Sequence, residues 1–323
     1  MNKSAIVTGI TGQDGSILAD QLIEDGYKVY GLLRRKSMGP DLGCSRHLEG
    51  NPMLEVVEGD ITDLPSLLHL VKLARPKEFY NMASQSHVGI SFKEPVHTAQ
   101  VTGLGVLNCL EAIRLSEIHS RFYQASTSEM FGGMNEIVQN EDSLFHPRSP
   151  YGCAKMYGYW ITINYRESYN MFACNGILFN HEGTRRGPNF VTRKITLAAV
   201  RISKGLQEKL YLGNLDARRD WGWAPDYVNG MRMMLQAAEP DDYVLATGET
   251  HSVREFCDAA FKHLGLDYRN YVEIDPRFYR PAEVDVLIGD ASKAYKKLGW
   301  KHSVSFEELV QKMVDYDLSL LEK

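Results

Sequence analysis

The segment AIVTGITGQDGSIL, residues 5–18, decides the fold of this chain. It opens as a short strand and continues into a helix whose apolar residues, from Ile17 to Ile23, share one face. The turn between them has the spacing G-x-x-G-x-x-G, which lets backbone N–H groups and the helix N-terminus meet a pyrophosphate. The segment therefore predicts a βα unit that binds a dinucleotide. We assign to that cofactor Gly9, Thr11, Gly12, Gln13, Asp14 and Gly15.

Strand-like and helix-like segments alternate along the first half of the chain, and further segments of both kinds follow in a looser pattern. Strands are expected at 28–33, 54–57, 78–82, 121–125, 172–179 and 243–246, with helices at 16–25, 103–115, 151–169, 191–205 and 226–238. Such alternation implies a parallel sheet covered on both faces, and right-handed crossovers give it the doubly wound order. Two capping boxes, at Ser252-x-x-Glu255 and Ser305-x-x-Glu308, predict later helix starts.

These patterns predict an α/β fold, a Rossmann-type doubly wound parallel sheet with a smaller mixed α/β substrate lobe that is mainly C-terminal. We expect residues 1–180, with about 225–250, to form the dinucleotide-binding domain. Residues 181–224 and about 251–323 would form the lobe over the carboxyl edge of the sheet, where ligands bind in such folds.

The composition is that of a soluble globular protein, with 323 residues, 44% of them hydrophobic and 24% charged. A net charge of −5 argues against nucleic acid as a partner. No apolar run approaches the roughly 18 residues of a membrane span. Five scattered cysteines without C-x-x-C spacing suggest free thiols, with neither a metal site nor disulfides. A strand that starts at residue 5 leaves no room for a signal peptide, so we expect a cytoplasmic protein.

The residues after the second strand indicate which dinucleotide binds. The acidic residue that would bind an NAD ribose is missing there, and Arg34 and Arg35 stand in its place. A 2′-phosphate prefers guanidinium groups, so NADP is expected over NAD. Asp60 and Ile61 follow the third strand; Asp60 either accepts from the adenine amine or caps its own turn.

Two further segments carry chemistry: Thr127-Ser128-Glu129, after the fifth strand, and Tyr151-x-x-x-Lys155, in a helix. Tyrosine is unreactive at its usual pKa of about 10. Lys155, one helical turn away, should lower the Tyr151 pKa by its charge and reach the nicotinamide ribose, and Thr127 can bond the same substrate hydroxyl. This set predicts alcohol oxidation with a nicotinamide. Glu129 adds a base for a following elimination, unless it is only a carboxylate that starts a helix.

The chain resembles the extended short-chain dehydrogenases/reductases and, among them, the GDP-mannose 4,6-dehydratase family. The resemblance runs from Lys3 to about Lys312. It rests on residues 9–15, Gln85-Ser86-His87-Val88, 126–132, 148–152, 179–182, 213–222 and 280–285.

The resemblance implies a mechanism in which NADP is regenerated. Tyr151 takes the O4 proton while C4 passes hydride to NADP⁺, and the new ketone acidifies C5. Glu129 removes the C5 proton, water leaves from C6 and hydride returns to C6, which gives GDP-4-keto-6-deoxymannose. Ser128 stands where deoxythymidine-diphosphate-glucose dehydratases have an aspartic acid, so Glu129 would act as base and then as acid. This favours GDP-mannose as substrate.

The resemblance also implies the remaining site residues. It assigns to the cofactor Met82, Ala83, Ser84, Gln85, Ser86, His97, Tyr151, Lys155, His181 and Arg186. It assigns to the nucleotide sugar Ser86, Ser128, Glu129, Tyr151, Asn180, Lys194, Arg219, Arg280 and Glu283. A diphosphate in a weakly acidic protein needs local cations, and Lys194, Arg219 and Arg280 are expected in loops over the sheet edge. We expect His87 to be a structural hydrogen-bonder.

Three alternatives stay open. The first is a dehydratase for a related sugar such as a GDP-heptose. The second is the reductase of the 4-keto product, which keeps Tyr151 and Lys155 but has no need of Glu129. The third is a non-catalytic NADP-binding regulator, which has no use for these three residues together. The segment 36–51 is shorter than the arginine-rich loop with which longer relatives contact cofactor across a tetramer interface, so a homodimer is expected more firmly than a homotetramer.

Overall fold

The computed structural model describes residues 3–35, 37, 39, 41–133, 138–279, 282 and 284–322. Its centre is a seven-stranded sheet in the order β11-β6-β5-β4-β1-β2-β3, with every pairing parallel. The strands are β1 (Ser4–Thr8), β2 (Lys28–Leu33), β3 (Leu54–Glu58), β4 (Glu78–Asn81), β5 (Arg121–Thr127), β6 (Ala173–Leu178) and β11 (Asp242–Leu245). The order reverses between β1 and β4, which creates a crevice at the carboxyl ends where ligands bind in doubly wound folds. The predicted Rossmann-type fold is confirmed.

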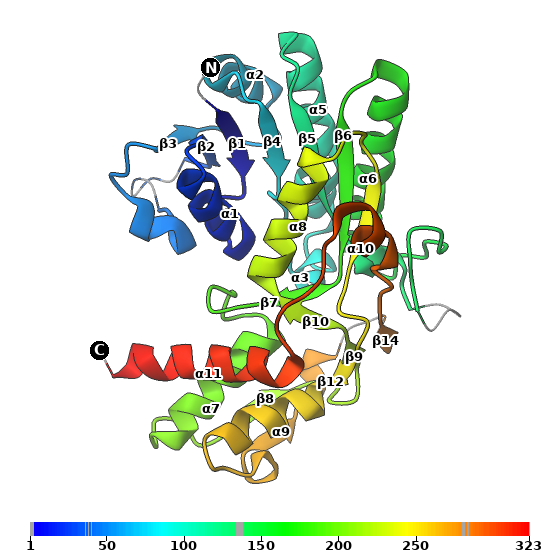
Figure 1. Cartoon of the computed structure of the whole chain (residues 1–323). Coiled ribbons are helices and arrows are strands. Elements are labelled where there is room, and N and C mark those ends of the chain that lie inside the picture. The colour runs from blue at the N-terminus through cyan, green and yellow to red at the C-terminus, as the bar shows by residue number, and fades with distance from the viewer. Residues whose placement is uncertain are drawn as a thin grey trace.

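Helices cover both faces of this sheet (Figure 1). Helices α2 (Leu64–Ala74), α5 (Gly105–Ser116) and α6 (Pro150–Tyr169) pack together on one face. Helices α1 (Gln13–Glu24) and α8 (Ala224–Gln236) pack on the other. Strand residues such as Ile6 and Val7 are fully buried, because a parallel sheet has no solvent face.

Short helical segments connect the strand ends to the long helices. They are the 3-10 helices η1 (Gly43–Leu48) and η3 (Ser128–Met130), the helices α3 (Val88–Ser91) and α4 (Pro95–Thr98), and the π-helix η2 (Ala99–Leu104). η2 leads directly into α5, so the helix expected at 103–115 starts within a π-helical turn. Such turns are often found beside functional sites.

A smaller lobe lies below the carboxyl edge of the large sheet (Figure 1). Its helices are α7 (Val191–Ser203), α9 (Val253–His263) and α11 (Phe306–Leu321). They enclose a separate apolar core that includes Trp221, Phe256 and Phe306. Both predicted capping boxes are present, at the starts of α9 and α11.

Small strand pairs and short helices complete the lobe. They are β7 (Asn180–Glu182) with β10 (Trp221–Trp223), β9 (Arg218–Arg219) between β12 (His251–Ser252) and β14 (Val286–Leu287), β8 (Leu210–Leu212) with β13 (Val272–Ile274), and the 3-10 helices η4 (Tyr268–Asn270) and η5 (Pro276–Phe278). Helix α10 (Ser292–Leu298) packs instead against α8 and β11, beside the large sheet.

Of the helices within the described ranges, none is both long and apolar enough to cross a membrane. The same ranges contain no group of three or more histidine, cysteine, aspartate or glutamate side chains that could hold a metal ion.

Candidate functional site

The glycine-rich turn lies between β1 and α1, at the point where the strand order reverses. Gly9 has a positive φ of 71°, and a Cβ there would lie 2.8 Å from the carbonyl carbon of Met82. The N–H of Gly12 donates to the Gly9 carbonyl at 3.0 Å, which closes the turn. No side chain caps α1, whose N-cap is Gly12. The first-turn amides therefore face a position that suits an anion.

The end of β4 forms the neighbouring wall of the crevice. The hydroxyl of Thr8 accepts from the backbone N–H groups of Met82 and Ala83, both at 3.1 Å. Gln85 is held through its N–H, which donates to Thr102 at 3.1 Å. The structure thus brings residues 82–85 beside the glycine turn. The sequence did not indicate that the Thr8 hydroxyl would hold this segment.

The other residues predicted near this wall are less enclosed. Ser84 shares a 3.2 Å hydrogen bond with Thr102, whereas Ser86 is exposed. His97 is exposed on α4. His87 accepts the Ile90 N–H at 3.2 Å through Nδ1 and caps α3, which is the structural role expected for it.

The predicted adenosine-side residues follow β2 and β3. Arg34 and Arg35 are both exposed, and Arg35 lies 3.8 Å from the carboxylate of Glu58. Asp60 accepts from the N–H and the hydroxyl of Thr62, at 2.8 and 2.7 Å, so its Oδ1 stabilises its own turn. Ile61 is buried. The two guanidinium groups are therefore exposed at the position where the 2′-phosphate of NADP is expected to bind.

Asp14 and His181 meet across the two parts of the molecule, 167 residues apart in the chain. His181 Nε2 lies 2.9 Å from Asp14 Oδ2, and its Nδ1 lies 2.8 Å from the Phe179 carbonyl oxygen. Burial alone would raise the Asp14 pKa, but the charge and hydrogen bond of His181, with smaller help from Gln13 and Arg186, lower it to about 2. Burial opposes the charged form of His181, yet Asp14 outweighs it and raises the His181 pKa. The two side chains form an ion pair.

Arg186 lies on the same side of the crevice. Its Nε is 2.9 Å from the buried carboxylate of Glu182, and its guanidinium lies 3.8 Å over the ring of Phe190. The Thr192 hydroxyl donates to the same carboxylate at 2.5 Å. Sequence reasoning missed Glu182, because its pairing with Arg186 depends on how the strand β7 and the following loop fold back.

The four residues predicted to act on substrate converge at the end of β5 and the start of α6. Thr127, Glu129, Tyr151 and Lys155 are each at most 8% exposed. The Thr127 hydroxyl accepts the Glu129 N–H at 3.3 Å and hydrogen-bonds to the Tyr151 hydroxyl. Ser149 caps α6 by accepting the Gly152 N–H at 3.0 Å, which fixes Tyr151 in the first helical turn. Ser128 is buried beside them.

The electrostatics of this cluster correct one prediction. Burial raises the Tyr151 pKa well above its usual value; the Thr127 hydrogen bond lowers it and the Glu129 charge raises it further. The Lys155 ammonium donates instead to the Ala125 carbonyl at 2.7 Å, and burial lowers the Lys155 pKa to about 8. The expectation that Lys155 lowers the Tyr151 pKa is therefore wrong for this structure, because desolvation dominates both groups.

The predicted sugar-nucleotide residues are spread over the lobe. Asn180 is half-buried in β7. Lys194 lies in α7, where its ammonium donates to the Tyr211 carbonyl at 2.6 Å and sits 3.8 Å over the Phe278 ring. Arg219 is buried in β9. Neither Lys194 nor Arg219 is in a loop, so that expectation is wrong: α7 and the strand pairs of β9 extend through these positions. Arg280 and Glu283 lie outside the described residues.

Comparison with known proteins identifies the family. A family model described as GDP-mannose 4,6 dehydratase matches residues 6–313, nearly the whole chain. The chain belongs to the GDP-mannose 4,6 dehydratase family. This confirms the resemblance inferred from the motifs.

Relatives within the GDP-mannose 4,6 dehydratase family match over nearly their full length. The chain is 52% identical to GDP-mannose 4,6 dehydratase 2 of Arabidopsis thaliana over 99% of this chain and 88% of the relative. It is 50% identical to GDP-mannose 4,6-dehydratase of Sinorhizobium fredii over 99% of this chain and 97% of the relative. Among solved structures, UDP-glucose 4-epimerase with UDP-glucose from Thermotoga maritima superimposes with a TM-score of 0.86 at 26% identity, covering 98% of this chain and 99% of that one.

Proposed function

We propose that this chain is an NADP-dependent GDP-mannose 4,6-dehydratase, a hydro-lyase that forms GDP-4-keto-6-deoxymannose. The observation that carries the proposal is the buried carboxylate of Glu129 beside Thr127 and Tyr151. A reductase needs the tyrosine and the lysine but no second base. A dehydratase needs a carboxylate within reach of the carbon next to the newly formed ketone.

The residues around the glycine turn fit NADP. The N-terminus of α1 has no side-chain cap, and the buried Oε1 of Gln13 has no hydrogen-bond partner among the described residues. Both features suit a diphosphate and its ribose. Arg34 and Arg35 would hold the 2′-phosphate, and Lys155 would bind the nicotinamide ribose. When bound, the cofactor accepts hydride from C4 of the sugar and returns it to C6.

The chain's own residues move the protons. Tyr151 acts as its phenolate and takes the proton from O4, and Thr127 orients the Tyr151 oxygen and the sugar hydroxyl. Glu129 then removes the C5 proton, which the C4 ketone has made acidic, and gives it to the C6 hydroxyl as that group leaves as water. When hydride returns to C6, C5 takes up the proton that Tyr151 accepted from O4, so Glu129 and Tyr151 both end the cycle in their starting states. Ser128 offers no acid of its own, which supports a single acid–base residue.

For the nucleotide sugar we propose Ser86, Ser128, Asn180, Lys194 and Arg219, together with Arg280 and Glu283. Lys194 and Arg219 supply cations for the diphosphate. Lys194 would have to exchange its bond to the Tyr211 carbonyl for a phosphate oxygen. Burial lowers the Lys194 pKa, with Asp275 opposing the effect.

We also propose that the protein assembles as a homodimer or homotetramer. The support is a patch of exposed apolar side chains on α4, η2 and α6: Val96, Leu104, Tyr157 and Trp160, from 40 to 69% exposed. α4 and α6 both pack against η2, so the elements that carry these side chains are neighbours. Exposed apolar patches on this scale mark interaction sites. A second copy of the chain would cover it.

For the organisation of the chain we propose the division expected from the sequence, with one change. Residues 1–180 and about 225–250 form the NADP-binding unit, and 181–224 with about 251–323 form the sugar-nucleotide unit, except that α10 belongs with the former. We propose a cytoplasmic location, supported by five cysteines that are all free.

To test the proposal, the purified protein is mixed with GDP-mannose and a catalytic amount of NADP⁺, without NADPH. The mass of the product is then measured by mass spectrometry. A product lighter by one water, with no net change in absorbance from NADPH, is expected. Unchanged GDP-mannose would overturn the proposal. A parallel reaction with a GDP-heptose measures which sugar is preferred, and a reaction with the 4-keto product and NADPH detects reductase activity.

A further inference from the structure

The short helix η1 lies against the outer side of the glycine-rich turn. The N–H of Cys44 donates to the Thr11 carbonyl at 3.0 Å, and the hydroxyl of Ser45 donates to the Ile10 carbonyl at 2.7 Å. Ser45 is completely buried, so its hydroxyl has no water to bond instead. Two consecutive carbonyl groups of the turn are thus held by two consecutive residues of η1.

Gly43 allows this close approach. Its φ is +52°, which disfavours a side chain, and a Cβ there would lie 2.6 Å from the Thr11 carbonyl oxygen and 3.2 Å from Thr11 Cβ. Gly50, at the other end of the segment, also has a positive φ, of 78°, but a Cβ there meets nothing within 4 Å. Both glycines therefore have a positive φ that disfavours a side chain, but of the two only Gly43 lies against the glycine-rich turn.

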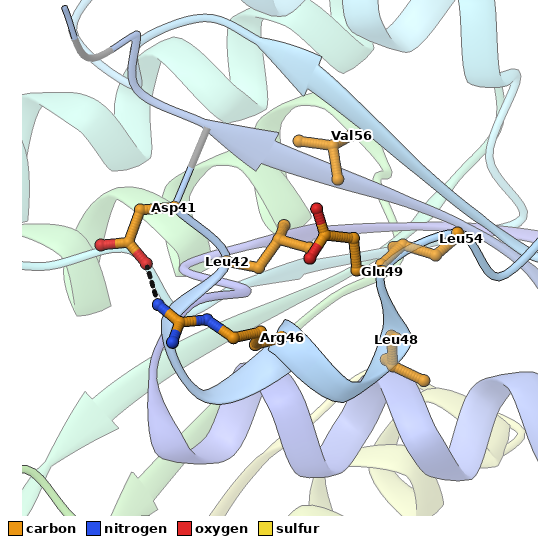
Figure 2. A pocket seen from close by; sticks show the side chains of 8 residues that line it. Asp41, Leu42, Arg46, Leu48, Glu49, Leu54 and Val56 are labelled. Atoms are coloured by element: carbon orange, nitrogen blue, oxygen red, sulfur yellow. Dashed lines mark ion pairs between the residues drawn. The ribbon is translucent and has the colours of Figure 1, made fainter. Parts of the chain in front are cut away.

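The opposite side of η1 borders a hollow. This hollow of about 270 Å³ lies between η1 and the edge strand β3, and its lining includes Leu42, Leu48, Leu54 and Val56. Figure 2 shows these side chains. The Asp41–Arg46 ion pair at the rim of the hollow, 3.6 Å long, joins two largely exposed side chains. Besides the packing of Leu48 into the apolar core, η1 is held by the bonds that it makes to the turn and to α1, where His47 meets Asp20 at 2.6 Å.

We propose that Ser45 and Gly43 are positioning residues for the cofactor, acting through the glycine turn. A trans peptide group carries its N–H opposite its carbonyl. Holding the Ile10 and Thr11 carbonyls on the η1 side therefore turns the following N–H groups, those of Thr11 and Gly12, away from η1. The Gly12 N–H is thereby directed at the Gly9 carbonyl, whose bond closes the turn. The turn is kept in its binding shape before any ligand arrives. This inference rests on the proposed function, because it takes NADP as the ligand of the turn.

The same helix also contacts the other wall of the crevice. The Cys44 thiol donates to the Arg185 carbonyl at 3.4 Å, and the Arg185 guanidinium reaches Asp20 on α1 at 2.7 Å. Arg185 precedes Arg186, a residue proposed to bind the cofactor. A shift of η1 would therefore displace both the glycine-rich turn and the segment that carries Arg185 and Arg186. The affinity for the cofactor is thus the property to measure.

The first experiment compares Ser45→Ala with Ser4→Ala in the full-length protein. Ser4 is also buried in the sheet and donates to the Ala74 carbonyl at 3.0 Å, but at the opposite end of β1 from the turn. NADP⁺ binding is measured by calorimetry without substrate, alongside the thermal midpoint. Each loss of a hydrogen bond should lower the midpoint by about 2 °C. Only Ser45→Ala should raise the NADP⁺ Kd, by about three- to tenfold.

The second experiment compares Gly43→Ala with Gly50→Ala, which share the positive-φ strain. Gly43→Ala should weaken NADP⁺ binding at least as much as Ser45→Ala, and Gly50→Ala should leave the Kd within about twofold of wild type. At saturating NADP⁺, kcat and the KM for GDP-mannose should stay unchanged in Ser45→Ala.

Equal Kd values for Ser45→Ala and wild type, or equal effects of Ser45→Ala and Ser4→Ala, would overturn the positioning role. A wild-type chain that binds no NADP⁺ would overturn the proposed function itself, and with it this inference. If Gly43→Ala fails to fold, the serine pair alone decides the question.

Discussion

Replacing Asp14 or His181 should remove a specific amount of stability from the protein without cofactor. The Asp14 pKa falls from 3.8 to about 2 in the folded chain. At about 1.4 kcal/mol per pKa unit, this shift corresponds to about 2 kcal/mol of stabilisation. His181 supplies the largest contributions that favour the carboxylate, so most of this energy should appear as coupling between the two side chains. We expect about 1.5 kcal/mol in a double-mutant cycle of Asp14→Asn and His181→Gln.

The pH dependence of this coupling has a definite sign. The Asp14 pKa is lowered on folding, so its stabilisation is complete above pH 3.8 and is lost as the pH falls through about 2. The His181 pKa is raised, so its stabilisation is complete below pH 6.5 and is lost as the pH rises through the folded value. The coupling should therefore be largest near pH 5 and should decline toward pH 9.

Urea unfolding of the wild type, both single variants and the double variant, at pH 5 and pH 9, measures this coupling. The His263–Asp315 pair is a matched control, with a 2.7 Å contact but a 63% exposed carboxylate. Its coupling should stay below about 1 kcal/mol, as for other surface pairs. A coupling at pH 5 no larger than that of the control, or one that grows toward pH 9, would show that Asp14 and His181 do not form a stabilising ion pair.

Three substitutions and one titration also test the site. Tyr151→Phe should slow the hydride step by about 10²- to 10⁴-fold, as loss of a general base does, and a near-normal single-turnover rate would rule out its role. Glu129→Gln should keep NADP⁺ affinity but stop the loss of water; full turnover would contradict the elimination role. In the cofactor-free protein, Lys155 should lose its charge as the pH rises through about 8. NMR of isotope-labelled lysines measures this pKa, and a value above 10 would refute the argument that burial lowers it. Arg35→Asp should weaken NADP⁺ binding more than NAD⁺ binding, and equal effects would place the 2′-phosphate elsewhere.

Local sequence patterns were sufficient to predict the fold. The strand at 28–33 and the capping boxes at Ser252 and Ser305 match the structure residue by residue, because each depends on neighbours within one or two turns. The convergence of Thr127 with Tyr151 also followed from local rules. Parallel strands bring their carboxyl ends to one edge, and helix α6 begins beside that edge.

Features that depend on distant segments could not be predicted. The Asp14–His181 pair joins residues 167 positions apart, and the bond from Ser45 to Ile10 joins residues 35 positions apart. The direction of the Tyr151 pKa shift required knowledge of how completely the site is buried. Only the folded lobe shows that the Lys194 ammonium donates to the Tyr211 carbonyl.

The interleaved path of the chain through the lobe has a consequence for its synthesis. The lobe's core takes residues from α7 and α9, but it also needs five buried side chains of α11: Phe306, Leu309, Val310, Met313 and Val314. Between α7 and α9 the chain returns to the large sheet to form α8 and β11. The large sheet can therefore assemble while the chain is still being made, whereas the lobe has an incomplete core until its last helix has left the ribosome. A nascent or truncated chain that lacks α11 would expose this apolar surface, and so would invite aggregation or proteolysis at the part of the molecule that we propose binds the sugar nucleotide.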